Sequence, residues 1–235
     1  FLEGNYTGAQ ELLAEFMEVS ADDPLKEEAA YMMAVSSFRR GNEMSGEILK
    51  TFLDTHPETI YRHEISFLIG SYHYDQKDWE DAKFWFNQAD LDYLSLSEQE
   101  DYSFRAGYTE LQLGNKEEAT RFFGLLYQNS NKYRDAADFY LGYIDYSNKN
   151  YNAALQRFQR LKDNLEYQEE VAFYTAQATF FDGKIDDAVR LAEAFVSHYP
   201  QSSHRAEMHR VLGNSYYRLG QPSRAIPNYE YYLAH

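Results

Sequence analysis

The chain contains no cysteine in 235 residues, so it forms no disulfide and offers no thiolate ligand to a metal. Basic residues are scarce as well, because 22 Lys and Arg stand against 38 Asp and Glu and leave a formal net charge of −16 at pH 7. Binding to a nucleic-acid backbone relies on clustered Lys and Arg, and anionic membrane surfaces also attract basic segments. The composition therefore argues against nucleic acid and against anionic membranes as partners.

The sequence also lacks the local patterns of membrane proteins and of common enzymes. No apolar run reaches the roughly 18 residues that a membrane-spanning helix needs. There is no glycine-rich phosphate loop, no nucleophile elbow and no zinc-protease motif. None of the seven histidines has a second and a third ligand at helical spacing, and abundant carboxylates are typical of a solvated helical surface. We therefore predict no catalytic residue, no metal site, no cofactor and no membrane insertion.

What the sequence does contain is an internal repeat. A small residue, called here the marker residue, recurs every 34 to 37 residues, at Ala9, Gly46, Ala82, Ala119, Ala154, Ala188 and Ala225. Five residues before each marker lies a turn residue, namely Gly4, Gly41, Lys77, Gly114, Lys149, Gly183 or Gly220. Twelve residues before the marker only Gly or Ala occurs, at Ala34, Gly70, Gly107, Gly142, Ala176 and Gly213. Because Gly inside a helix costs about 1 kcal/mol relative to Ala, these sites predict a helix contact too close for a side chain.

Apolar residues recur at three- and four-residue spacing on both sides of each turn, so every repeat is predicted to be two helices, A and B. The fold class is all-α, a solenoid of antiparallel helix-turn-helix units. Residues 1–235 form one array with a half-repeat at 1–24 and repeats at 27–60, 63–97, 100–133, 135–168, 169–202 and 206–235. We expect this array to be part of a longer protein. Ser97 and Glu100 are expected to form a capping box at the start of one A helix.

These features resemble the tetratricopeptide repeat (TPR) family along the whole chain. The stretch with Leu212, Gly213, Tyr216, Ala225 and Tyr229 follows the family pattern closely, and Pro57 and Pro200 end their units as the family's proline does. The pattern is not perfect, because Lys50 and Ala192 stand where an aromatic residue is expected. The resemblance implies a right-handed superhelix that binds a protein segment in a concave groove and performs no catalysis.

A second, narrower resemblance concerns the last repeats. Phe195, the segment 199–202 (Tyr-Pro-Gln-Ser) and the segment 212–217 are similar to bacterial cell-envelope TPR proteins of the Tol-Pal and outer-membrane assembly type. That resemblance favours a periplasmic or cell-envelope location, with a cytoplasmic location as the alternative. It does not name a partner.

In the TPR family the groove is lined by helix A. Numbering each repeat so that its marker residue is position 20, the resemblance places positions 2, 5, 9, 12 and 13 in that groove. The candidate groove residues are Glu28, Tyr31, Glu64, Phe67, Ser71, Tyr74, Asp101, Phe104, Tyr108, Phe139, Tyr143, Tyr146, Glu170, Phe173 and Gln177. Acids fill position 2 in five of six repeats, Glu207 being the fifth, which predicts a partner that carries Lys or Arg.

Two of these assignments have an alternative. The aromatic residues at positions 5 and 12 share a stripe with the small residue at position 8, so they also fit interhelical packing. Acids at position 2 also fit stabilisation of a helix N-terminus by the helix dipole. Position 9 lies off the stripe, and Tyr108 and Tyr143 are therefore the strongest candidates for ligand contact.

The sequence thus predicts a noncatalytic scaffold that binds a protein or peptide. Three alternatives remain open. The first is a self-association module that forms a homo-oligomer through exposed end helices, and the second is a regulatory interaction arm of a larger cytoplasmic signalling or transcription protein. The third and least favoured is an enzymatic role, for which a catalytic domain would have to lie outside these residues.

Overall fold

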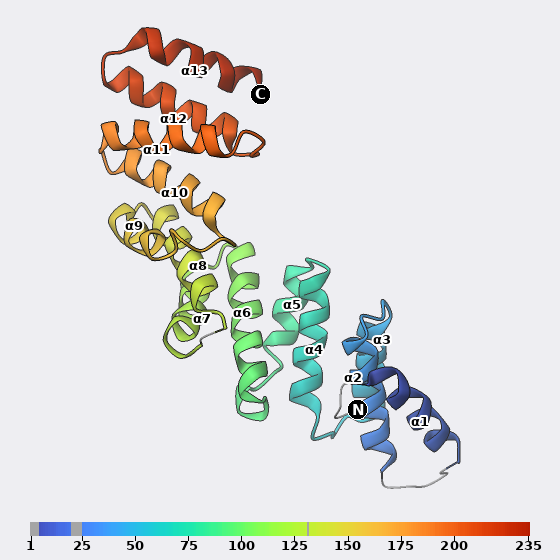
Figure 1. Cartoon of the computed structure of the whole chain (residues 1–235). Coiled ribbons are helices and arrows are strands. Elements are labelled where there is room, and N and C mark those ends of the chain that lie inside the picture. Colours follow the sequence, from blue (N-terminus) through green and yellow to red (C-terminus); the bar gives the residue numbers. More distant parts are fainter. Residues whose placement is uncertain (1–4, 20–24, 131) are drawn as a thin grey trace. The chain divides into compact units, whose positions relative to one another are not determined.

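The computed structural model describes residues 5–19, 25–130 and 132–235, and every regular element within them is a helix (Figure 1). The elements are α1 (Tyr6–Val19), α2 (Lys26–Arg39), α3 (Ser45–Thr55), α4 (Arg62–Asp75), α5 (Trp79–Phe86), the short 3₁₀ helix η1 (Leu91–Tyr93), α6 (Leu96–Gln112), α7 (Lys116–Asn129), α8 (Arg134–Ser147), α9 (Tyr151–Arg160), α10 (Gln168–Phe181), α11 (Ile185–His198), α12 (Arg205–Arg218) and α13 (Pro222–Ala234). The all-α fold class is confirmed. Gly4 and parts of the predicted half-repeat 1–24 lie outside the described residues.

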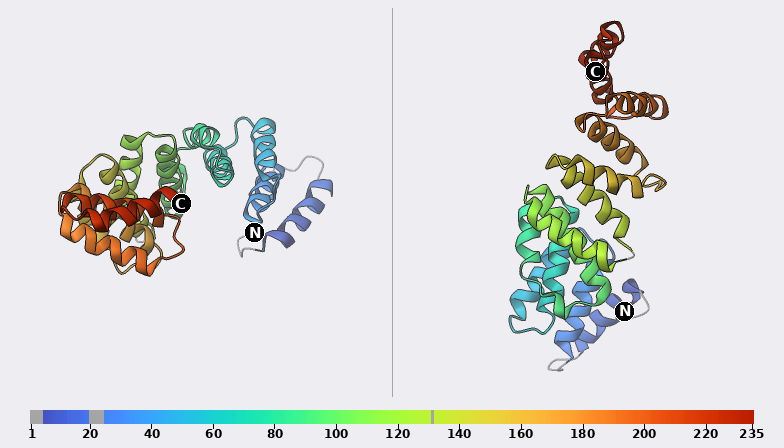
Figure 2. Two further views of the ribbon diagram at one scale, coloured as in Figure 1. Left: turned by 90° about the horizontal axis from the view of Figure 1, so that it is seen from above. Right: turned by 90° about the vertical axis from the view of Figure 1, so that its left-hand side faces the viewer.

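The chain comprises two compact units, residues 1–122 and 123–235, and the boundary falls within α7. Inside the units helices pack on their neighbours in sequence, as α4 does on α5 and α12 does on α13 (Figure 2). Alternate helices also touch: α2 and α6 both contact α4, and α8 and α12 both contact α10. We call the even-numbered helices α2 to α12 the A helices and the odd-numbered helices the B helices. This two-layer stacking is that of a helical solenoid, whereas the predicted repeat boundaries stay a prediction.

The turns from A to B helices share one backbone conformation. The turn residue has a positive φ in all six described turns: Gly41 (70°), Lys77 (61°), Gly114 (83°), Lys149 (65°), Gly183 (85°) and Gly220 (68°). In the first of these turns the N–H of Asn42 donates to the carbonyl of Ser37 and the N–H of Gly41 donates to the carbonyl of Phe38. Such bonds satisfy the last carbonyls of the preceding helix. A side chain in this conformation costs roughly 1 kcal/mol, which explains why Gly occupies four of the six turns.

Three glycines at position 8, Gly70, Gly142 and Gly213, lie in close contact with a ring of the B helix, and the sequence predicts such a close contact. A Cβ added to Gly70 would lie 2.6 Å from the ring of Phe86, and one added to Gly142 would lie 2.8 Å from the ring of Phe158. In the last repeat the ring of Tyr229 approaches Gly213 in the same way, at 2.7 Å. Each ring belongs to the residue sixteen positions after its glycine. The A and B helices of these repeats are therefore held together by a ring seated directly on glycine backbone.

One expected helix start is wrong by two residues. Helix α6 begins at Leu96, and its capping box is formed by Ser95 and Glu98, with the Ser95 N–H donating to Glu98 at 3.0 Å. The expected box of Ser97 and Glu100 is not formed. Both pairs have the required spacing, and the earlier one is used because it extends the helix by half a turn and lets the Gln99 amide donate to the carbonyl of Leu94.

Replacing Gly142 by Leu should lower the free energy of unfolding by about 1–3 kcal/mol or more, because the new side chain overlaps the Phe158 ring. Gly124 of α7 offers a matched control, since nothing lies within 4 Å of a Cβ added there. Gly124→Ala should raise the free energy of unfolding by up to about 1 kcal/mol through helix propensity. Urea melts followed by circular dichroism measure both changes. Equal effects of the two substitutions would contradict the close contact.

Candidate functional site

The structure divides the predicted groove residues into core and surface. Phe67, Phe139 and Phe173 at position 5 are only 4%, 7% and 6% exposed and belong to the hydrophobic core. Their assignment to a ligand groove is therefore corrected to interhelical packing, which position 5 provides because it shares a stripe with position 8. Ser71 and Gln177 at position 9 are also buried, at 2% and 5%. Position 9 is thus not a uniformly accessible row.

In the first unit an aromatic surface remains around the end of α4. Tyr74, Trp79 and Tyr108 contact one another edge to face, with ring centroids 5.7 to 5.8 Å apart, and we call them the first aromatic cluster. The guanidinium of Arg105 lies 4.8 Å from the Tyr74 ring centroid and donates to the Asp75 carboxylate at 2.7 Å. Tyr74, Trp79 and Tyr108 are all half-buried, so their rings are fixed by packing while part of each stays accessible.

The second unit has a related surface around the end of α8. Tyr146 lies 6.0 Å from Tyr151, 5.3 Å from Tyr174 and 6.3 Å from Phe181, and Tyr143 lies 5.4 Å from Tyr174. We call these five residues the second aromatic cluster. Phe181 is 41% exposed and stacks on Tyr151. Burial raises the pKa of Tyr146 and of Tyr174 to about 12, so both phenols stay neutral hydrogen-bond donors at physiological pH.

Sequence reasoning missed half of these rings. Trp79 and Tyr151 both occupy position 17, the first residue of a B helix, five residues after Tyr74 and Tyr146. That shared spacing was the available signal, because a five-residue step across the left-handed turn brings the two rings together. Tyr174 and Phe181 lie on α10, at positions 6 and 13, and join the cluster from the next repeat.

Several polar groups of the A helices bond to one another within the units. The Tyr31 hydroxyl donates to Glu64 at 2.7 Å, and its ring stacks on Tyr61 at 3.8 Å. In the second unit the Tyr146 hydroxyl donates to the Gln177 carbonyl oxygen, the Gln177 amide reaches Glu207 at 3.4 Å, and Glu207 accepts from Arg210.

The predicted acidic row is therefore only partly available to a partner. Glu64 and Glu207 have partners inside the protein, whereas Glu28 is exposed, and Asp101 and Glu170 are half-buried. Phe104 is half-buried and lies 6.5 Å from Tyr108.

A separate groove lies between α9, α10 and α11 in the second unit. Its volume is about 330 Å³, with Val171, Leu191 and Phe195 among its apolar lining and Lys162 and His198 among its polar lining. This groove could not be predicted from the sequence, because its residues belong to three helices and follow no single period. It is an alternative surface to the two aromatic clusters.

Comparison with known proteins agrees with the architecture. Residues 175–235 match the family model described as tetratricopeptide repeat. Comparison with curated protein sequences found no match. Solved structures with the same fold include MamA AMB-1, with a TM-score of 0.60 and 17% identity over 74% of this chain and 98% of that chain. MamA MSR-1 gives a TM-score of 0.59 and 15% identity over 74% of this chain and 94% of that chain.

A tetratricopeptide repeat protein from Parabacteroides merdae ATCC 43184 gives a TM-score of 0.54 and 19% identity, over 99% of this chain and 87% of that chain. The helix pairs, the glycine contacts and the family match at 175–235 together define the fold as a tetratricopeptide repeat solenoid. None of the described helices combines the length and the apolar character needed to cross a membrane.

Glu64 should make stability depend on pH. Burial raises the pKa of its carboxyl group, and the hydrogen bond from Tyr31 only partly opposes this. The folded state therefore binds more protons than the unfolded state, so stability falls as pH rises from about 4.3 toward the folded pKa. Glu64→Gln retains an acceptor for Tyr31 and removes the charge. The stability of this variant should therefore increase relative to that of the wild type as pH rises through that interval.

Urea midpoints of both proteins between pH 4 and pH 8 measure this difference. Tyr31→Phe is the complementary variant, because it removes the stabilising hydrogen bond and should steepen the loss of stability with rising pH. Parallel pH profiles for the wild type and Glu64→Gln would show that burial of the Glu64 charge has no energetic consequence.

Proposed function

We propose that this protein is a noncatalytic scaffold that binds protein segments on the A-helix surface, at the aromatic cluster of each unit. The observation that carries the proposal is the packing of accessible Tyr, Trp and Phe rings against one another on the A helices and at the adjoining turns of both units. Rigid aromatic rings lose little conformational entropy on binding and are enriched among residues that dominate interface energies. A tetratricopeptide repeat fold supports the same role.

The net charge of −16 favours a segment that carries Lys or Arg among apolar residues. Glu28 and Glu170 remain the acids best placed to attract it, because Glu64 and Glu207 are bonded within the protein. The proposed cell-envelope location rests only on the sequence resemblance of the last repeats.

Tyr108→Ala combined with Tyr143→Ala should weaken binding of such a segment at least about tenfold, because the two substitutions remove one partly buried ring from the contact surface of each cluster. Partners are identified first by placing a photo-crosslinking residue at Tyr143 and, as a control, at exposed Arg190 on α11. Affinity of the crosslinked segment is then measured with purified proteins. It should also fall as salt is raised, since exposed charges are screened beyond about 8 Å at physiological ionic strength.

The double variant must first show an unchanged thermal melt. Equal affinity of wild type and variant would then exclude the aromatic clusters as the binding surface. Crosslinking from Arg190 but not from Tyr143 would instead indicate that the partner binds on the B helices or in the groove between α9, α10 and α11.

Self-association is a second candidate, favoured by the exposed face of α13. Seven residues after the marker residue, other B helices bury an apolar side chain: Leu53, Leu126, Leu161 and Phe195 are at most 6% exposed. The corresponding Tyr232 of α13 is 37% exposed, and Leu233 beside it is 81% exposed. We infer that the α13 helices of two copies cover these residues.

Leu233→Glu combined with Tyr232→Ser should shift a dimer to the monomer, because it places charge in the proposed contact. Sedimentation velocity over a range of protein concentrations measures this shift. Leu165→Glu is the matched control, since Leu165 is also 81% exposed but lies in the turn before α10. A wild type that is monomeric at all concentrations, or a dimer that both variants leave intact, would rule out this contact.

A further inference from the structure

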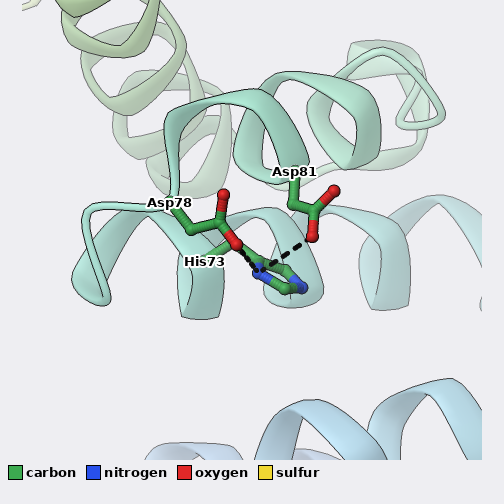
Figure 3. Close-up of side chains that lie close together, drawn as sticks. All are labelled: His73, Asp78 and Asp81. Atoms are coloured by element: carbon green, nitrogen blue, oxygen red, sulfur yellow. Dashed lines mark ion pairs between the residues drawn. The ribbon is translucent and has the colours of Figure 1, made fainter.

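Three side chains converge at the turn between α4 and α5 (Figure 3). His73 comes from the last turn of α4, and Asp78 and Asp81 come from the start of α5. The Nδ1 atom of His73 lies 3.4 Å from a carboxylate oxygen of Asp78 and 3.9 Å from one of Asp81. One donor atom from each residue falls within 4.8 Å of the others.

The imidazole of His73 is buried without a conventional hydrogen bond. The residue is 7% exposed, and its Nε2 atom has no hydrogen-bond partner. Its Nδ1 atom points to the two carboxylates, at distances longer than the roughly 2.7–3.2 Å that is typical of an N–H···O hydrogen bond. Two carboxylates that face one ring nitrogen without a short hydrogen bond leave a place for a cation between that nitrogen and the carboxylate oxygens.

The side chain of Asp78 does not cap helix α5. Asp78 is the N-cap residue of α5, a place where Asp usually accepts a hydrogen bond from the backbone of the first helical turn. Its side chain makes no such bond, and the carboxylate is directed at His73 instead. The described ion pairs of Asp78 and Asp81 are those with His73.

His73 is at position 11 of its repeat, and in the two following repeats the residue at position 11 pairs with a cationic side chain. Position 11 holds Glu110 and Asp145 in the two following repeats. Glu110 accepts from the Lys83 ammonium at 2.9 Å, and Asp145 accepts from the Arg157 guanidinium at 2.9 Å.

For His73, at position 11 of its own repeat, the residues equivalent to Lys83 and Arg157 are Glu47 and Trp85. The repeat with two carboxylates at the turn is therefore one in which neither of these positions supplies a cation. A small cation from solution would take the place that an ammonium or guanidinium group fills elsewhere.

We propose that His73, Asp78 and Asp81 bind one divalent transition-metal ion of the zinc class. One imidazole nitrogen with two carboxylate oxygens is a donor set that zinc accepts, at bond lengths of about 2.0–2.2 Å. The carboxylates are 49% and 59% exposed, so they are free to close on an ion while the buried ring stays fixed. A water molecule completes the fourth position. The ion joins the end of α4 to the start of α5 and stabilises this repeat.

Titration calorimetry with zinc chloride and tag-free, chelator-treated protein tests the proposal at pH 7. We expect one saturable site and a higher melting temperature with zinc. Asp78→Asn and Asp81→Asn should each weaken zinc binding at least about tenfold. Loss of a residue that only supports a metal ligand already lowers metal affinity by about 10–100-fold, and loss of a ligand should cost no less. Glu80→Gln is the matched control, because Glu80 is exposed on the same helical turn and is not one of the three proposed ligands.

A second measurement separates loss of the site from a change in folding. NMR of the histidine side chains should show that zinc moves the His73 ring signals in wild type and in Glu80→Gln, and moves them in neither aspartate variant. The proposal is overturned if the wild type has no saturable site, if all four proteins bind zinc equally, or if zinc leaves the His73 signals unchanged. Equal binding in all four proteins would assign the zinc to scattered surface carboxylates.

Discussion

The repeat depends on the contact between a glycine of helix A and a ring of helix B. Where position 8 is glycine, as at Gly70, Gly142 and Gly213, the ring lies on bare backbone and the two helices approach too closely for a side chain there. The two repeats that have Ala at this position, Ala34 and Ala176, also lack the ring sixteen residues later, where Lys50 and Ala192 occur. In these two repeats the glycine and the ring are therefore replaced together, so the unexpected Lys50 and Ala192 accompany the change from glycine to alanine at position 8.

This contact also decides which residues remain for binding. Position 5 lies on the same stripe as position 8, so Phe67, Phe139 and Phe173 there lie in the core, whereas Phe104 is half-buried. Tyr74 and Tyr146 at position 12 and Trp79 and Tyr151 at position 17 lie next to the left-handed turn and stay half-buried. The packing that fixes the core thus also holds the surface rings in place, which reduces the conformational entropy lost when a partner binds.

The fold could be predicted because it follows from one period. Turn residues, marker residues and small residues at position 8 recur at fixed offsets, and each offset corresponds to a backbone requirement found in the structure, such as the positive φ of Gly114. The candidate site was less predictable. Helical periodicity gives the face on which a residue lies but not its depth, so Tyr143 and the buried Gln177 at the same repeat position look equivalent in the sequence.

The other features of the site could not be predicted from the sequence, because they depend on how the turns between helices bring side chains together. The first aromatic cluster combines residues from three helices, and His73, Asp78 and Asp81 come from the end of one helix and the start of the next, so neither group follows the spacing of a single helix. The start of α6 shows the same limit at shorter range, because two serine–glutamate pairs with identical spacing compete, and the extra half turn of helix decides for Ser95.

Position 11 shows how a repeat fold can vary its chemistry without changing its backbone. In three successive repeats the residue there lies near the end of helix A, and its partners are the Lys83 ammonium for Glu110, the Arg157 guanidinium for Asp145 and the carboxylates of Asp78 and Asp81 for His73. Each repeat contacts only its neighbours, so a change at this position alters one helix pair and leaves the others intact. The glycine contact keeps the helix pair constant, and polar positions such as this one are then free to differ between repeats.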